Sequence, residues 1–158
     1  MIELAILIGL QASGKSSFYR RHLAVTHALV SKDLLRNNRR PARRQTQLVT
    51  ENLTAGRSVA VDNTNVTVEL RKELIDLGHS LGATVTGYYL AAKLADCLTR
   101  NAERTGKNRV PDVGLFAAVK ALVRPAYSEG FDRLFFVGIA DGGAFDVRPW
   151  VEEEASRG

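Results

Sequence analysis

The stretch Gly9-Leu10-Gln11-Ala12-Ser13-Gly14-Lys15-Ser16 decides the fold of this 158-residue chain. It matches the pattern G-x-x-x-x-G-K-[ST] at every fixed position, after an apolar run at residues 2–8 and before a helix expected at about 15–23. Glycines let the backbone amides of such a loop point inward around a phosphate, and the following helix adds its positive end. A plain strand-to-helix turn needs no Lys-Ser pair. The stretch therefore predicts a nucleotide phosphate site.

The rest of the chain alternates apolar runs with helical patterns. Strands are predicted at residues 27–30, 58–61, 85–90 and 134–137, and helices at 45–55, 68–81, 94–104 and 113–123. In the second of these helices we expect one apolar stripe of Leu70, Leu74, Leu77 and Leu81. The alternation is typical of an α/β, P-loop NTPase fold, with an open parallel sheet of about five strands and helices on both faces. We expect one domain over residues 1–158, with a small basic lid at about 104–112 and a peripheral tail at about 140–158.

Composition excludes several classes of protein. Hydrophobic residues at 45% and charged residues at 25% do not fit collagen-like, mucin-like, coiled-coil or disordered chains. The single cysteine, Cys97, excludes an intrachain disulfide and is expected to be a small buried side chain. With no run of 18 apolar residues and no basic segment before the apolar start, we expect a cytoplasmic protein without a membrane partner. The sequence does not indicate an oligomeric state.

The net charge of +5 is local. Five arginines fall within nine residues that contain no acid, and the remaining basic and acidic residues cancel. A local positive charge predicts an anionic partner, whereas the alternative is a solvated arginine-rich loop. These residues are Arg36, Arg39, Arg40, Arg43 and Arg44.

The chemistry expected of the loop is phosphoryl transfer. Lys15 would reach the β- and γ-phosphates of a nucleotide, and the Ser16 hydroxyl would bind Mg²⁺. No N-K-x-D segment is present, which disfavours a guanine-specific switch GTPase. The chain is also short for a ring-forming mechanical ATPase. A compact phosphotransferase fits best.

Candidate functional residues follow two of the predicted strands. The carboxyl ends of parallel strands meet at one edge of a sheet, so these residues should lie near the phosphate loop. Asp33 could accept a proton from an attacking hydroxyl, or it could simply cap a short helix. Arg36 could hold an anionic acceptor. Asp62 ends the third strand, where an acidic residue commonly supports Mg²⁺, but the Asp-Asn-Thr-Asn run could also be only a turn.

Arg100 and Arg104 are spaced i, i+4 on a predicted helix that leads into a basic loop. This arrangement predicts a lid that supplies an arginine to the transferring phosphoryl group. The alternative is a solvated helix face.

Four blocks occur in order and together resemble one family. They are residues 9–16 with Ser17-Phe18, Val30-Ser31-Lys32-Asp33 with Arg36, residues 59–65, and residues 100–104 running to Val110-Pro111. This order resembles the kinase domain of the 5′-hydroxyl polynucleotide kinases, the phage and animal enzymes that heal DNA and RNA ends. The resemblance covers residues 1 to about 138 and includes Tyr127-Ser128-Glu129-Gly130-Phe131. One departure is Lys32, where the family usually has arginine.

The resemblance implies ATP and Mg²⁺ as cofactors and the 5′-hydroxyl end of DNA or RNA as the acceptor. It implies catalytic roles for Lys15, Asp33 as the base, Arg36 and Arg104. The expected nucleotide-binding residues are Gly9, Gln11, Ala12, Ser13, Gly14, Lys15, Ser16, Ser17 and Arg104, with Ser16 and Asp62 at the metal. The expected acceptor-binding residues are Arg36, Asp62, Asn63, Thr64 and Asn65, joined on charge and position by Arg39 and Arg40. The alternatives are a kinase acting on a sugar acid, nucleoside or amino-sugar nucleotide, and an ATP-binding regulatory module.

Overall fold

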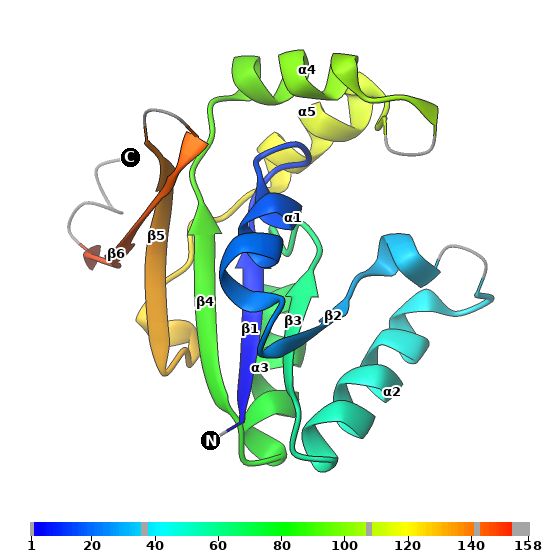
Figure 1. Ribbon diagram of the computed structural model, residues 1–158, viewed down its shortest axis with the longest axis vertical. Helices are drawn as coiled ribbons and strands as arrows, with labels where there is room; N and C mark the ends of the chain where they lie inside the picture. The colour runs from blue at the N-terminus through cyan, green and yellow to red at the C-terminus, as the bar shows by residue number, and fades with distance from the viewer. Residues whose placement is uncertain (1, 36–37, 107–108, 141–142, 153–158) are drawn as a thin grey trace.

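The computed structural model describes residues 2–35, 38–106, 109–140 and 143–152, with the Asp33 side chain outside that description. Within these residues one six-stranded sheet has the order β2-β3-β1-β4-β5-β6, as Figure 1 shows. The first five strands in that order are parallel and β6 is antiparallel to β5. Their bounds are β1 Glu3–Ile8, β2 His27–Val30, β3 Ser58–Asp62, β4 Thr84–Leu90, β5 Arg133–Ile139 and β6 Phe145–Pro149. The predicted α/β fold is confirmed, and β6 lies in the predicted peripheral tail.

Helices cover both faces of the sheet, because successive residues of a strand point to opposite sides. Leu4, Ile6 and Ile8 of β1 pack in one buried cluster with side chains of α2 and α3, and Ala5 and Leu7 pack in another with α1 and η1. The bounds are α1 Lys15–Phe18, continuing as the π-helix η1 Tyr19–Leu23, the 3₁₀-helix η2 Lys32–Leu35, α2 Pro41–Thr54, α3 Val68–Ser80, α4 Leu94–Glu103, α5 Asp112–Ala121 and the 3₁₀-helix η4 Tyr127–Glu129. None of the described helices is both long and apolar enough to cross a membrane.

Two helices depart from the expected pattern. Helix α2 begins four residues before its predicted start, because Pro41 occupies the first turn, where its missing N–H costs nothing. In α3 the predicted stripe is wrong at Leu70, which is 41% exposed, while Arg71 beside it is fully buried. A helical hydrophobic pattern does not anticipate a buried charge, and this one is neutralised by Glu129.

The strand order brings the predicted functional segments to one edge. Leu7 near the end of β1 is in register with Asp62 at the end of β3, and Val30 at the end of β2 pairs with Val61. The phosphate loop follows β1, and η2 follows β2. These two segments and Asp62 therefore meet at the carboxyl edge of the parallel strands, where open α/β sheets bind ligands.

Candidate active site

The phosphate loop is wound tightly between β1 and α1. Ala12 and Gly14 both have positive φ, 61° and 103°, and a Cβ on Gly9 would lie 2.9 Å from Ser13 Oγ. The Gly9 N–H donates to the Thr64 carbonyl at 3.0 Å, which ties the loop to the segment after β3. The glycines of the motif are thus required for the close approach at Gly9 and the left-handed turn at Gly14.

Lys15 and the Ser13 hydroxyl of the loop fit a phosphate ligand. Lys15 is 8% exposed, and its Nζ donates to the carbonyls of Gly9 at 3.1 Å and Leu10 at 2.8 Å. Among the described residues, Gln11 Oε1 and Ser13 Oγ are buried with no hydrogen-bond partner. Buried polar groups are normally paired. The Ser13 hydroxyl can donate to a phosphate oxygen, whereas Gln11 Oε1 can only accept a hydrogen bond and needs a donor.

Ser16 and Asp62, 46 positions apart in the chain, meet at the loop. The Ser16 hydroxyl donates to Asp62 Oδ2 at 2.8 Å. Hydroxyl and carboxylate oxygens are the kind of ligand Mg²⁺ prefers, usually with water and phosphate oxygens completing its shell. The described residues contain no group of three or more His, Cys, Asp or Glu placed to hold a metal ion. The pair therefore fits a magnesium site that shares its ion with a nucleotide.

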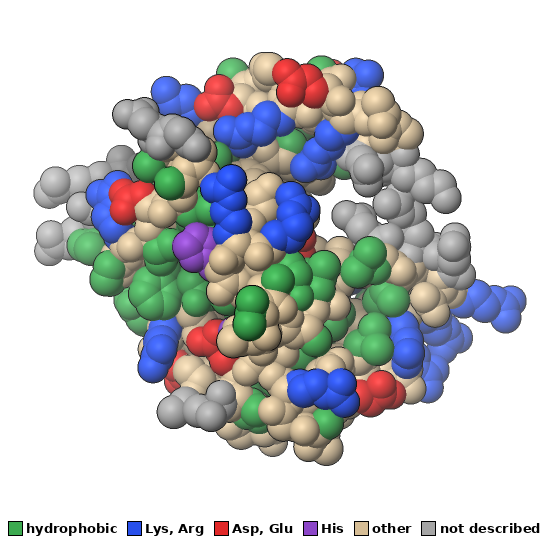
Figure 2. All heavy atoms as spheres, in the orientation of Figure 1, with side chains coloured by type: hydrophobic (Ala, Val, Ile, Leu, Met, Phe, Trp, Pro, Cys, Tyr) green, Lys and Arg blue, Asp and Glu red, His purple; other side chains and the backbone are tan. Residues whose placement is uncertain are grey.

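A cleft of about 480 Å³ joins the phosphate loop to the ends of β2 and β3. Its positively charged lining residues among those described are Lys15, Arg20 and Arg104, and Asp62 is its carboxylate. Figure 2 shows basic side chains gathered over α1 and below α4, on this side of the molecule. The remaining lining residues are Gln11, Ala12, Gly14, Ser16, Ser17, Leu29, Ser31, Leu34, Asn63, Thr64 and Val110. Gly9 and Ser13 belong to the loop without lining the cleft.

The two lid arginines have different positions. Arg104 lines the cleft, whereas Arg100 Nη1 donates to the Ala12 carbonyl at 2.9 Å. Helix α4 ends at Glu103 and the backbone of Arg104 is extended, with ψ 152°, so the two side chains do not share a helix face as expected. Arg100 supports the phosphate loop at its strained residue Ala12, and Arg104 is the one that faces the cleft.

A buried asparagine closes the base of the lid. Asn101 is fully buried at the end of α4, and its Oδ1 accepts from the Val110 N–H at 2.9 Å. Its Nδ2 donates to the Val110 carbonyl. Both hydrogen bonds hold residue 110, a lining residue of the cleft, against α4. The sequence did not predict this role, although Asn101 lies within residues 100–104, one of the four blocks that carry the resemblance. Lys107 and Asn108 lie outside the described residues.

The segment after β2 borders the other side of the cleft through Ser31 and Leu34. Asp33 lies between them in η2. The Lys32 N–H donates to Asn63 Oδ1 at 2.9 Å, which fixes η2 against the residue that follows Asp62. Arg36, the second predicted residue here, lies outside the described residues.

The Asp-Asn-Thr-Asn run divides into lining and supporting residues. Asn63 and Thr64 line the cleft together with Asp62, and Asn63 Nδ2 also donates to Gln45 Oε1 of α2 at 2.6 Å. Asn65 does not line the cleft. It is 4% exposed, has φ 47°, and donates its Nδ2 to the Leu7 carbonyl at 2.7 Å. The expected contact of Asn65 with an acceptor is therefore replaced by a structural role.

An ion pair beneath this run was also missed. Arg71 Nη1 donates to the Asn65 carbonyl at 3.0 Å, and its Nε and Nη2 donate to the two Glu129 carboxylate oxygens at 2.7 and 3.1 Å. Both side chains are buried. The pair holds the turn that carries the lining residues. The only sign of this ion pair in the sequence is that Glu129 lies within residues 127–131, which the resemblance to the polynucleotide kinases includes.

Arg20 and the arginine cluster also differ from expectation. Arg20 lines the cleft and donates to Ser17 Oγ at 3.1 Å, although sequence reasoning assigned no role to it.

Arg39 and Arg40 do not line the cleft. They border a separate open hollow, together with Asn38, Arg43, Arg44 and Gln47. Arg39 and Arg40, which are expected to bind the acceptor, thus border this hollow and not the cleft, on the segment that leads into α2 at Pro41.

Cys97 is fully buried under the phosphate loop, in a cluster with Ala12 and Leu115. Burial is the main cause that raises the pKa of its thiol, so the neutral form is favoured at neutral pH. The prediction of a small buried side chain is confirmed.

Comparison with known proteins fits this geometry. A family model described as AAA domain matches residues 4–125, which include the phosphate loop, η2, Asp62 and Arg104. The chain belongs to this family. The curated Transcription factor bHLH140 of Arabidopsis thaliana is 30% identical in an alignment of 142 positions that covers 84% of this chain. The chain spans only 16% of the length of that protein.

Solved structures share the fold. A gluconokinase from Sinorhizobium meliloti 1021 is 20% identical with a TM-score of 0.63, covering 88% of this chain and 83% of that one. Kti12 of Chaetomium thermophilum, in complex with ADP-AlF3, is 16% identical with a TM-score of 0.71, covering 98% and 94%. A chain of the Pnkp1/Rnl/Hen1 complex is 19% identical with a TM-score of 0.56, covering 63% and 39%. These likenesses show that the chain has the fold of these proteins.

Proposed function

We propose that the chain is an ATP-dependent phosphotransferase that moves the γ-phosphate of ATP to the 5′-hydroxyl of a polynucleotide. The observation that carries the proposal is the cleft, which joins the phosphate loop and the Ser16–Asp62 pair to η2, the segment of Asp33. Donor and acceptor groups of a phosphoryl transfer need such a shared cleft, because catalysis rests on positioning and charge.

The donor half contains the phosphate loop and the lid arginine. Lys15 and the loop amides would bind the β- and γ-phosphates, and Arg104, which lines the cleft, would contact them from the lid side. Ser16 and Asp62 would hold Mg²⁺, which when bound offsets the negative charge of the phosphate oxygens. Arg20 adds a further positive charge at the wall near Ser17.

The acceptor half is assigned from the resemblance and from the position of η2. The attacking hydroxyl oxygen forms a bond to the γ-phosphorus while the bond from that phosphorus to the ADP oxygen breaks, and the hydroxyl proton goes to the Asp33 carboxylate. Asn63 supports this assignment because it holds the Lys32 backbone beside Asp62. Arg36 would bind the phosphate next to the reacting hydroxyl.

A transfer assay tests the proposal. Incubation with γ-labelled ATP and 5′-hydroxyl RNA or DNA should give a 5′-phosphorylated oligonucleotide and ADP. Asp33→Asn should retain ATP binding but lose at least about 100-fold in transfer rate, since it keeps the shape of the side chain and loses the base. Transfer by this variant at the wild-type rate would rule out Asp33 as the base.

A small-molecule kinase is the second candidate. It is supported by the fold shared with the gluconokinase, which covers most of both chains. Gluconate, nucleosides and amino-sugar nucleotides therefore belong in the same assay. Transfer to one of them, with none to oligonucleotides, would favour this candidate. Slow ATP hydrolysis without transfer to any acceptor would instead favour a regulatory module.

A further inference from the structure

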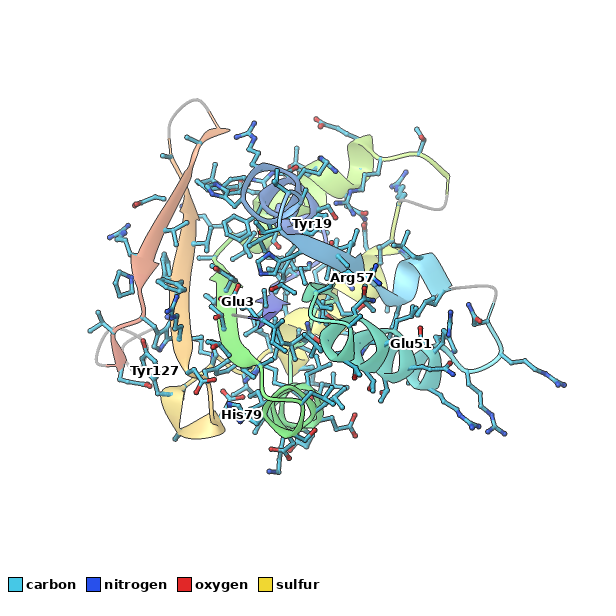
Figure 3. The ribbon with its side chains drawn as sticks, turned by 60° about the horizontal axis from the view of Figure 1, so that its bottom comes forward. Glu3, Tyr19, Glu51, Arg57, His79 and Tyr127 are labelled. Atoms are coloured by element: carbon cyan, nitrogen blue, oxygen red, sulfur yellow. The ribbon has the colours of Figure 1, made fainter. Side chains whose placement is uncertain are left out.

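The start of α2 carries an open hollow of about 610 Å³, separate from the cleft. All six of its lining side chains carry hydrogen-bond donors, and none of them is acidic. Figure 3 shows long side chains with nitrogen at their ends reaching outward from this part of the molecule. The lining residues are Asn38, Arg39, Arg40, Arg43, Arg44 and Gln47.

Among the described residues, the positive charge of this hollow has little compensation nearby. The first turn of α2, all of it described, contains no acidic residue. Arg44 Nη1 contacts Gln47 Oε1 at 3.0 Å, and its ion pair with Glu51 is long, 3.9 Å, between side chains 40% and 59% exposed. An exposed pair of this kind contributes little and is easily exchanged for another anion. Four guanidinium groups around one hollow match the phosphates of a polyanion, which accept paired N–H donors.

The hollow lies beside the acceptor half of the cleft. Leu34 lines the cleft and Asn38 lines the hollow, and the two are four positions apart in the chain, which is at most about 14 Å. Gln45 of α2 is buried and accepts from Asn63, a lining residue of the cleft, at 2.6 Å. This hydrogen bond connects α2, which carries Arg43 and Arg44, to the cleft.

We infer that this hollow binds the phosphates of a polynucleotide acceptor beyond the one next to the reacting hydroxyl. The inference rests on the proposed function and specifies its substrate as a polymer. A stacked strand presents one phosphate per about 3.4 Å, so a strand of about four or five nucleotides is long enough to extend from the cleft into the hollow. Acceptor affinity should therefore rise with length up to about five nucleotides and then level off. A nucleoside 3′-phosphate would occupy the cleft alone.

The test measures KM for 5′-hydroxyl acceptors of increasing length, starting from a nucleoside 3′-phosphate and ending at ten nucleotides. In the wild type, KM should fall at least about tenfold by five nucleotides. The variant R39Q/R40Q/R43Q/R44Q should lose most of this fall, and the slope of log KM against log salt should shrink by up to about 3. The control variant R57Q/K72Q/K120Q/R148Q loses the same charge at exposed residues elsewhere. It should keep the wild-type dependence of KM on acceptor length.

Failure of the inference differs from failure of the proposed function. If the arginine variant keeps the wild-type length dependence, the hollow does not bind the acceptor. If the wild type phosphorylates no 5′-hydroxyl, the proposed function fails, and binding of a six-nucleotide oligonucleotide without ATP tests the hollow alone. Equal binding by wild type and variant, or competition by polyglutamate as strong as by the oligonucleotide, would overturn the assignment.

Discussion

Asp62 combines two properties at the scale of single residues. It ends a buried strand, and its Oδ2 accepts the Ser16 hydroxyl at 2.8 Å. Asp62→Asn keeps the shape but removes the charge that favours a divalent cation. The Mg²⁺ concentration needed for half-maximal activity should rise at least about tenfold. A magnesium titration checks this, and an unchanged midpoint would remove Asp62 from the metal site.

Arg100 and Arg104 should give different kinetic defects. Arg104→Gln removes a charge facing the cleft, so kcat should fall at least about tenfold. Arg100→Gln removes the hydrogen bond to the Ala12 carbonyl, so KM for ATP should rise several-fold with a smaller change in kcat. Steady-state measurements of kcat and KM for ATP in the two variants test these separate roles. Identical defects in both variants would contradict them.

Sequence alone could predict residues whose role follows from local spacing. The loop from Gly9 to Ser16 and the position of Asp62 at a strand end needed only the motif and the strand pattern. Asn65 and Arg100 could not be assigned, because their partners, the carbonyls of Leu7 and Ala12, are 58 and 88 positions away. A backbone carbonyl has no sequence signature as a partner.

At the scale of elements, α3 depends on a buried charge pair. Arg71 and Glu129 are 0% and 7% exposed, so replacing one leaves the other uncompensated. Glu129→Gln should therefore lower the free energy of unfolding by about 3–5 kcal/mol, measured by urea denaturation. On the same helix, Asp76→Asn breaks the exposed Lys72–Asp76 pair and should cost less than about 1 kcal/mol. Equal effects of the two variants would contradict the supporting role of Arg71.

The helix patterns predicted where elements occur better than which side they bury. Helix α3 was predicted at 68–81 and spans Val68–Ser80, yet its buried face includes Arg71 and leaves Leu70 exposed. The pattern ranks side chains by hydrophobicity, whereas the fold buries Arg71 because a carboxylate and a carbonyl meet it.

At the scale of the whole molecule, acid should lower stability through contacts at the edge opposite the cleft. Glu3 at the start of β1 bonds His27 of β2 at 2.7 Å and Thr86 of β4 at 2.7 Å. The hydrogen bond from His27 is the largest cause that lowers the pKa of Glu3 below 4.5, against the opposing effect of burial. A lowered folded-state pKa means that this stability is present above pH 4.5 and lost as the pH falls through the folded value.

Urea denaturation across pH checks this sign. The free energy of unfolding should fall below about pH 4.5, and Glu3→Gln should make that fall less steep. Glu73→Gln, at an exposed position of α3, should leave the slope unchanged. A Glu3→Gln profile identical to the wild type would remove Glu3 from the acid response.

The alternation of strands and helices predicted the fold class, and the sheet order then came from tertiary structure. Neither the central place of β1 nor the antiparallel β6 could be derived from the pattern, because strand pairing depends on contacts between distant segments. That order matters for function, since it sets Asp62 beside the phosphate loop and η2 beside Asp62.

The central claim is phosphate transfer in the cleft to a polynucleotide end. The most direct measurement follows the label from γ-labelled ATP onto a 5′-hydroxyl oligonucleotide, for the wild type and Asp33→Asn. We predict labelled oligonucleotide with the wild type and at least about 100-fold less with the variant, at equal ATP binding. No label on any oligonucleotide from the wild type, while a small-molecule acceptor is labelled, would contradict the account.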